Sequence, residues 1–197
     1  MFLTWEHIRI VAFALFLATL IAVPLGILIT RNEGIAKKVL NAANILMTIP
    51  SIALFGLMLP VLALIGHGLG KVPAVIALVL YSLLPIIRNT YVGIKNVPPE
   101  LVEAGKGVGM NSLTRLKEVE IPLAVPVIIA GLRTAAVMNI GITAIAAYIG
   151  AGGLGVFIQQ GIARAYDEMV MTGAILVALL ERILTPKGIK LGRSLRR

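Results

Sequence analysis

The sequence predicts an all-α protein, a polytopic membrane helix bundle of about five spans with a helix-turn-helix between two of them. Of its 197 residues, 58% are hydrophobic and 14% are charged, and the mean hydropathy is +0.97. The apolar residues also gather in long runs. A soluble domain of this length cannot bury so much apolar surface. We therefore expect neither a soluble enzyme nor a free nucleic-acid-binding protein.

Three apolar runs predict the first three spans. Residues 10–29 carry no charge and are long enough, at about 1.5 Å per residue, to cross a hydrocarbon core of about 30 Å. This run is longer than the apolar part of a signal peptide and no small-residue cleavage site follows, so we interpret it as a retained span. Span 45–65 is broken by Pro50-Ser51 and by Pro60, and span 72–87 ends at the polar cluster that begins with Arg88.

Two further runs predict the last spans of a single domain covering residues 1–197. Residues 121–149 form a long run that contains Arg133 and Asn139. The fifth span, 169–184, is apolar only as far as Leu180, a stretch of about 18 Å that is too short to cross by itself. Its crossing is favoured by the distribution of charge.

The Lys and Arg residues predict the orientation. With five spans, fourteen of the 18 lie on one side, in the first loop, in the segment between spans three and four, and in the C-terminal tail. Arg9, Lys71 and Arg164 lie on the other side. Loops rich in Lys and Arg stay in the cytoplasm, so we expect a multi-pass cell-membrane protein with its N-terminus outside and its C-terminus in the cytoplasm. This bias accounts for the net charge of +9 without a nucleic-acid partner.

The cytoplasmic segment 95–120 predicts a short helix-turn-helix. Pro98-Pro99 suits the first turn of a helix, and the glycines at 105, 107 and 109 are expected to stop that helix. Asn111 or Ser112 can cap a second helix, and Pro122 begins the next span.

Several kinds of chemistry find no support in the sequence. There is no cysteine, and His7 and His67 stand 60 positions apart without an acidic cluster, so we expect no metal site and place both histidines at a membrane interface. No phosphate-loop motif occurs, so the chain does not bind ATP in that manner. The runs contain neither an acidic residue, as an ion-coupled secondary transporter would need, nor paired catalytic groups, as an intramembrane enzyme would need. No cofactor is expected.

The cytoplasmic segment also resembles a family signature. Permeases of binding-protein-dependent ABC transporters share Glu-Ala-Ala, three residues, Gly, nine residues, and Ile-x-Leu-Pro. Here every spacing fits, with Gly in place of the second Ala and with Val and Ile at the apolar positions: Glu103, Ala104, Gly105, Gly109, Val119, Ile121 and Pro122. The resemblance implies that this loop couples the permease to a cytoplasmic ATPase.

It further implies three kinds of protein partner, besides the lipid bilayer that surrounds the spans. These are a separate ATP-binding subunit, an extracellular or periplasmic substrate-binding protein, and a second permease, either identical or a paralogue. The chain offers no room for a fused substrate-binding domain.

Three stretches resemble osmoprotectant permeases, which carry glycine betaine, carnitine or choline. They begin at Thr48, Ile121 and Ile149. Permeases for methionine and other amino acids carry similar glycine-rich loops, so an amino-acid importer stays open as the alternative.

Polar residues within the fourth span are candidates for the translocation path. Arg133 either lines that path or pairs with a carbonyl or acidic group, because an unpaired charge there is expensive. Asn139 and Thr143 either face the same interior or bond across helices. The stretch from Gly150 to Gly155 lacks the residues of a phosphate loop, and we expect it to pack backbones closely or to form an external turn that meets the binding protein.

Overall fold

A computed structural model describes residues 1–184, and every regular element among them is a helix. The all-α prediction is confirmed. Of the six basic residues of the tail that contributed to the predicted orientation, Arg182 belongs to α9 and the other five, from Lys187 on, lie outside the described residues. The elements, in chain order, are α1 Phe2–Leu28, η1 Ile29–Arg31, α2 Glu33–Thr48, α3 Ser51–Ala63, α4 Lys71–Lys95, α5 Pro99–Gly107, α6 Ser112–Arg115, η2 Leu116–Glu120, α7 Ile121–Ala146, η3 Ala147–Ile149, α8 Gly155–Ala163 and α9 Asp167–Leu184.

Three helical stretches in this part of the chain are long and apolar enough to cross a membrane: residues 2–31, 71–95 and 112–149. A bent pair, α2 with α3, makes a fourth if it is counted as one broken span. The fifth predicted span falls in α9, whose four charged residues keep it out of this group.

The structure breaks the predicted span 45–65 at Pro50, as the sequence indicates, but not at Pro60, which lies inside α3. The chain bends by 97° between α2 and α3, because Ile49 is extended before Pro50 and a proline disfavours helical backbone in the residue that precedes it. The carbonyl freed at Ile49 accepts a hydrogen bond from the Tyr81 hydroxyl on α4. The apolar run is therefore bent between α2 and α3, and Tyr81 of α4 stabilises the bend.

The centre of the bundle is α4, which packs along both α1 and α7. Close packing depends on small residues at a spacing of four on α1, since Ala14, Ala18 and Ala22 are fully buried. A Cβ at Gly26 would lie 2.6 Å from Thr90, and one at Gly131 on α7 would lie 2.7 Å from the Pro85 carbonyl. Small residues let helix backbones approach in a membrane, where the hydrophobic effect does not drive helices together.

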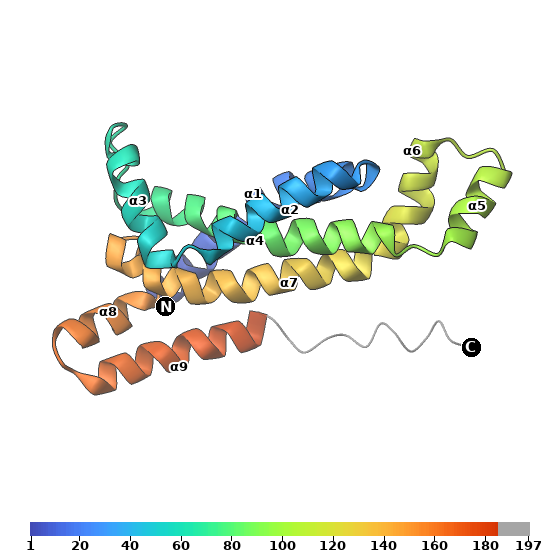
Figure 1. Ribbon diagram of the computed structural model, residues 1–197. Helices are drawn as coiled ribbons and strands as arrows, with labels where there is room; N and C mark the ends of the chain where they lie inside the picture. The colour runs from blue at the N-terminus through green and yellow to red at the C-terminus, as the bar shows by residue number, and fades with distance from the viewer. Residues whose placement is uncertain (185–197) are drawn as a thin grey trace.

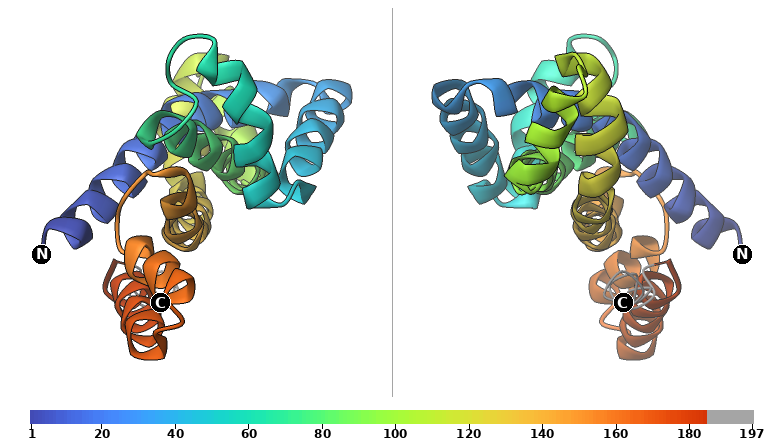
Figure 2. Two further views of the ribbon diagram at one scale, coloured as in Figure 1. Left: turned by 90° about the vertical axis from the view of Figure 1, so that its left-hand side faces the viewer. Right: turned by 90° about the vertical axis from the view of Figure 1, so that its right-hand side faces the viewer.

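The long helices give the molecule two distinct ends (Figure 1). The α5–α6 hairpin lies at one end. The N-terminus and the loop that follows α7 lie at the other. The α8–α9 hairpin lies below α7 (Figure 2), and Leu180 of α9 belongs to the same hydrophobic cluster as Val11 of α1. These two ends are described in turn below.

Candidate functional site

The α5–α6 hairpin is built by local sequence signals. Pro99 occupies the first turn of α5, and the helix ends in a Schellman motif: Met110 N–H donates to the Gly105 carbonyl at 3.0 Å and Gly109 N–H to the Lys106 carbonyl at 2.9 Å. Gly109 supplies the left-handed backbone of this motif, with φ +82°. The helix stop is therefore Gly109.

The glycines at 105 and 107 do not stop the helix as predicted. Both lie inside α5, and Gly105 is buried against the Arg115 side chain of α6. The Asn111 side chain begins α6 by accepting hydrogen bonds from the N–H groups of Leu113 and Thr114, which is one of the two caps the sequence allowed.

The predicted coupling residues divide between the two helices of the hairpin and the start of α7. Glu103 and Ala104 are exposed on α5, next to the buried Gly105. Val119 and Ile121 are half-buried where the hairpin joins α7, and Pro122 is exposed. The hairpin thus presents an exposed acidic and small-residue surface on a base packed against the spans.

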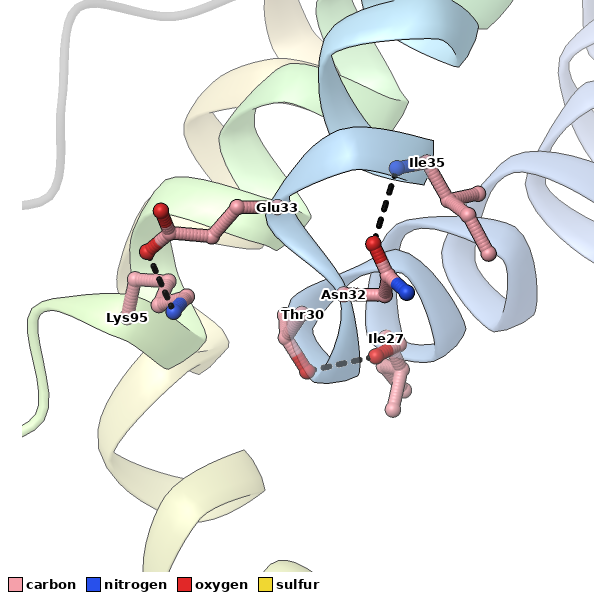
Figure 3. Close-up of polar contacts among 6 residues, drawn as sticks. All are labelled: Ile27, Thr30, Asn32, Glu33, Ile35 and Lys95. Atoms are coloured by element: carbon pink, nitrogen blue, oxygen red, sulfur yellow. Dashed lines mark hydrogen bonds and ion pairs between the residues drawn. The ribbon is translucent and has the colours of Figure 1, made fainter.

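A cavity of about 320 Å³ lies where this base meets the spans. Glu103 and Lys106 line it from α5, together with Glu120 from the start of α7 and residues at the ends of α1 and α4. Next to it, the turn into α2 is closed by hydrogen bonds of Thr30 and Asn32, and Lys95 at the end of α4 lies 3.4 Å from Glu33 (Figure 3). The hairpin therefore faces the ends of α1 and α4 across this cavity.

A buried ion pair at the hairpin base was not identified from the sequence. The Nε of Arg115 donates to Oε1 of Glu120 at 3.0 Å, and each residue is only 9% exposed. The two residues are five positions apart, which is not a spacing that places side chains together on an α-helix. They meet because η2 is a π-helical turn.

The candidate path residues on α7 occupy two different settings. Asn139 and Thr143 are fully buried, and Ser82 on α4 lies 3.2 Å from the Asn139 side-chain oxygen. Thr143 donates to the Asn139 carbonyl at 2.7 Å. Arg133 is half-buried six positions earlier, about 120° round an ideal helix. The structure brings Asn139 and Thr143 together but places Arg133 on another face.

The amide nitrogen of Asn139 has no hydrogen-bond partner, although it is buried. Ser82 has one proton, and its hydroxyl lies 2.7 Å from the Leu78 carbonyl as well as near Asn139. A flipped Asn139 amide would donate to the Ser82 oxygen and leave the Ser82 proton for Leu78, and amide orientation is assigned from such networks. The Asn139 amide would then donate one hydrogen bond within the protomer.

At the opposite end, two residues of α1 hold the loop after α7. Glu6 accepts from Gly153 N–H at 2.9 Å and pairs with Lys71 at 2.7 Å. The Nδ1 of His7 accepts from Leu154 N–H at 3.2 Å, so its Nε2 carries the proton and donates to the Ile140 carbonyl at 3.1 Å. His7 is thus fully buried in helix packing at this end of the bundle.

The same end carries an apolar groove of about 550 Å³ between α1 and α4. Three aromatic residues line it, namely Phe2, Trp5 and Phe13, with Arg9 and Lys71 at its polar edge. The Glu6 carboxylate in this groove is already paired with Lys71. The groove therefore offers aromatic surface without a free negative charge for a cation.

No group of three or more possible metal ligands occurs among residues 1–184. The structure thus adds no metal centre to the sites described above. The two ends of the bundle therefore carry the α5–α6 hairpin and the loop after α7, which Glu6 and His7 hold in place.

A family model described as "binding-protein-dependent transport system inner membrane component" matches residues 22–184. The chain belongs to this family. Members are permease components that act with a separate ATPase, so this inner membrane component is not itself an enzyme. Membership also argues against the ion-coupled secondary transporter.

The relatives of this inner membrane component are similar over most of their length. The "Osmoprotectant import permease protein OsmW" of Salmonella typhimurium strain LT2 is 53% identical over 199 residues, covering 95% of this chain and 93% of that protein. The "Choline transport system permease protein OpuBB" of Bacillus subtilis is 43% identical, covering 95% and 89%. A solved structure of the MetNI methionine ABC transporter in an inward-facing conformation aligns with a TM-score of 0.80 at 25% identity, covering 91% and 88%.

Proposed function

We propose that this chain is the permease subunit of an ATP-driven importer of osmoprotectants, compact quaternary amines such as glycine betaine, carnitine and choline. The observation that carries the proposal is the 53% identity to an osmoprotectant import permease over almost the whole chain. Relatives named for choline, glycine betaine and carnitine transport follow at 40–43% identity. The match to a methionine transporter is a likeness of fold at lower identity.

The α5–α6 hairpin is the proposed docking element for the cytoplasmic ATPase. Its conformation is fixed by the Schellman motif and by the Asn111 cap, so it can present one surface. Glu103 and Ala104 are exposed on that surface, and Glu103 is suited to pair with a basic side chain of the ATPase. Val119, Ile121 and Pro122 form the base that joins this surface to α7.

The proposed orientation puts the hairpin in the cytoplasm and the N-terminus outside. Basic residues gather near the hairpin end of the helices, including Arg31, Lys95, Lys106 and Lys117. Lys and Arg in short loops favour the cytoplasmic side. The same orientation places the loop after α7 on the outer side, toward a substrate-binding protein, and the C-terminus in the cytoplasm.

The permease is proposed to supply a weakly selective path. Asn139 and Thr143 are closed inside the protomer and Arg133 lies on a separate face, so these residues do not form one ligand pocket. A quaternary ammonium is normally bound by aromatic faces. The aromatic groove between α1 and α4 is unsuited to a cation because Arg9 and Lys71 line it. We therefore assign selectivity to the separate binding protein and the path itself to a pair of permeases, identical or paralogous.

Uptake by a reconstituted system tests the proposal. Liposomes holding the permease, its ATPase and the binding protein are offered labelled glycine betaine, carnitine, choline and methionine. We expect ATP-dependent uptake of at least one quaternary amine, and none when the binding protein is omitted. Uptake of methionine alone would overturn the substrate class and leave the family assignment standing.

A further inference from the structure

The hairpin is joined to α7 by the π-helical turn η2, without an intervening loop. Helix continues from Ser112 to Ile149. π-Helical turns are rare and occur frequently at functional sites. Because the chain stays helical across this junction, a displacement of α6 is passed to α7 instead of being absorbed in a flexible connection.

The ion pair of Arg115 and Glu120 brackets this turn. Residues five apart are brought into register by the i→i+5 hydrogen bonding of a π turn, and the Nε–Oε1 distance is 3.0 Å. Lys117 and Glu118, within the same turn, are exposed. The Arg115–Glu120 pair is thus a buried contact across η2, whereas the other charged residues of this turn are exposed.

Burial of this pair calls for a role other than stability. A buried ion pair costs desolvation that its attraction only partly recovers, and an apolar pair of similar volume is often as stable or more so. The best-attested use of such pairs is to specify one geometry among several. Here the specified geometry is the angle at which the hairpin leaves α7.

The pair also contacts the first helix of the hairpin. A Cβ placed on Gly105 of α5 would lie 3.4 Å from Cγ and 3.5 Å from Cδ of Arg115, so α5 rests on the aliphatic part of this side chain. On its other side, Glu120 lines the cavity shared with Glu103 and Lys106 of α5 and with the ends of α1 and α4. One ion pair therefore touches both hairpin helices and the start of α7.

We propose that the buried Arg115–Glu120 pair, closed across the π turn η2 and packed beneath Gly105, is the joint that transmits movement of the hairpin to α7. Arg115 and Glu120 are positioning residues in this scheme and need not touch the ATPase. The inference rests on the proposed function, because it takes the hairpin as the docking element. It adds the residues through which a movement caused by docking at α5 is transmitted to a membrane span.

The test follows movement at the far end of α7 and needs no substrate. A single cysteine replaces Tyr148, which is exposed in η3, in this chain that has no cysteine of its own. The complex of permease and ATPase is reconstituted, and the rate of thiol labelling is measured with and without ATP. Retention of the ATPase on the permease is measured in parallel.

The pair is then altered by Arg115→Met, which keeps the aliphatic stem, and by Glu120→Gln, which keeps the size. We expect both variants to retain the ATPase while the ATP-dependent change in labelling falls about tenfold, the factor expected from losing one charge-assisted hydrogen bond. Lys117→Met and Glu118→Gln serve as matched controls in the same turn and keep the full response. Arg115→Met/Glu120→Leu leaves no lone buried charge, so it folds if a single variant does not, and it is expected to lack the response.

Three results would overturn the proposal that the Arg115–Glu120 pair transmits movement from the hairpin to α7. The first is a full ATP response in the double variant or in a folded single variant. The second is an equal loss in the Lys117 and Glu118 controls. The third is the absence of any ATP response at residue 148 in the parent that retains its ATPase. Failure of the parent to retain the ATPase would instead refute the docking role of the hairpin, and the joint with it.

Discussion

Glu6 accepts a hydrogen bond at 2.9 Å from the backbone N–H of Gly153, which lies 147 positions later in the chain. The same carboxylate pairs with Lys71 at the start of α4. One side chain in the first turns of the molecule thus links α1, α4 and the loop after α7. The end of the bundle opposite the hairpin is held together by this contact and by its neighbour His7.

Removal of the Glu6 side chain should destabilise the protein because it leaves Gly153 N–H without its acceptor. We expect Glu6→Ala to lower the free energy of unfolding by about 1–3 kcal/mol. Lys71→Met is the matched control: its side chain is 60% exposed, so losing its ion pair should have a small effect. Thermal unfolding of the detergent-solubilised proteins measures both. Equal losses in the two variants would show that the ion pair, and not the loop contact, matters.

His7→Phe should be more damaging than its size suggests. The ring nitrogens of His7 satisfy the Ile140 carbonyl and Leu154 N–H in a fully buried setting, and phenylalanine leaves both unpaired. The expected loss is about 2 kcal/mol or more. His67→Phe, at an exposed histidine, is the control and should leave the midpoint of thermal unfolding unchanged. An unchanged midpoint for His7→Phe would contradict the two hydrogen bonds.

Gly155→Ala should prevent normal folding. Its Cβ would lie 2.0 Å from the Ala144 carbonyl oxygen, a backbone atom that cannot move aside without unpacking α7. Gly141→Ala introduces the same methyl group into α7 where nothing lies within 4 Å. We expect little folded Gly155→Ala protein by size-exclusion chromatography and a normal yield of Gly141→Ala. A monodisperse Gly155→Ala variant would show that the loop packs less closely than the structure indicates.

The residues tolerated at position 109 should be limited by backbone conformation alone. No atom lies within 4 Å of a Cβ placed there, but its φ of +82° costs an ordinary residue about 1–2 kcal/mol. Gly109→Val is therefore expected to weaken co-purification of the ATPase. Gly109→Asn should retain most of it, because asparagine tolerates the left-handed region. Equal retention by the two variants would mean that the Schellman motif does not shape the docking surface.

The proposed orientation is tested by thiol labelling in intact cells. Single cysteines replace Ser112 in the hairpin and His67 in the loop before α4, two positions that are exposed at opposite ends. A membrane-impermeant reagent should label His67→Cys and not Ser112→Cys, while permeabilised cells label both. Gly153 is unsuitable for this purpose, since its φ is +79° and a Cβ would lie 3.0 Å from His7. Labelling of Ser112→Cys alone would reverse the orientation.

Much of the hairpin could be predicted from local sequence. Pro99, Gly109 and Asn111 act through their own backbone preferences, so their positions alone indicate where each short helix starts or stops. Gly105 and Gly107 were misread because glycine permits a helix stop without imposing one. The family signature was readable for the same reason, as it consists of residues at fixed spacing.

Other features depend on contacts that spacing does not reveal. The run 45–65 carries no charge, and Pro50 indicates a break in it but not that the chain turns there by 97°. Arg115 and Glu120 stand five apart, a distance that pairs side chains only in the π turn that the folded chain adopts. Neither the angle of the bend nor the ion pair can be predicted from composition or residue spacing.

The sequence by itself determined the class of protein, the approximate runs that form its helices and the identity of the hairpin, because apolar run length and turn-forming residues act locally. Tertiary structure decided that His7 is buried, that Glu6 meets Gly153, and that Asn139 faces Ser82. These relationships join residues up to 147 positions apart. They arise only when α1 and α7 pack on α4, since the distance between two side chains is then set by helix packing and no longer by their separation along the chain.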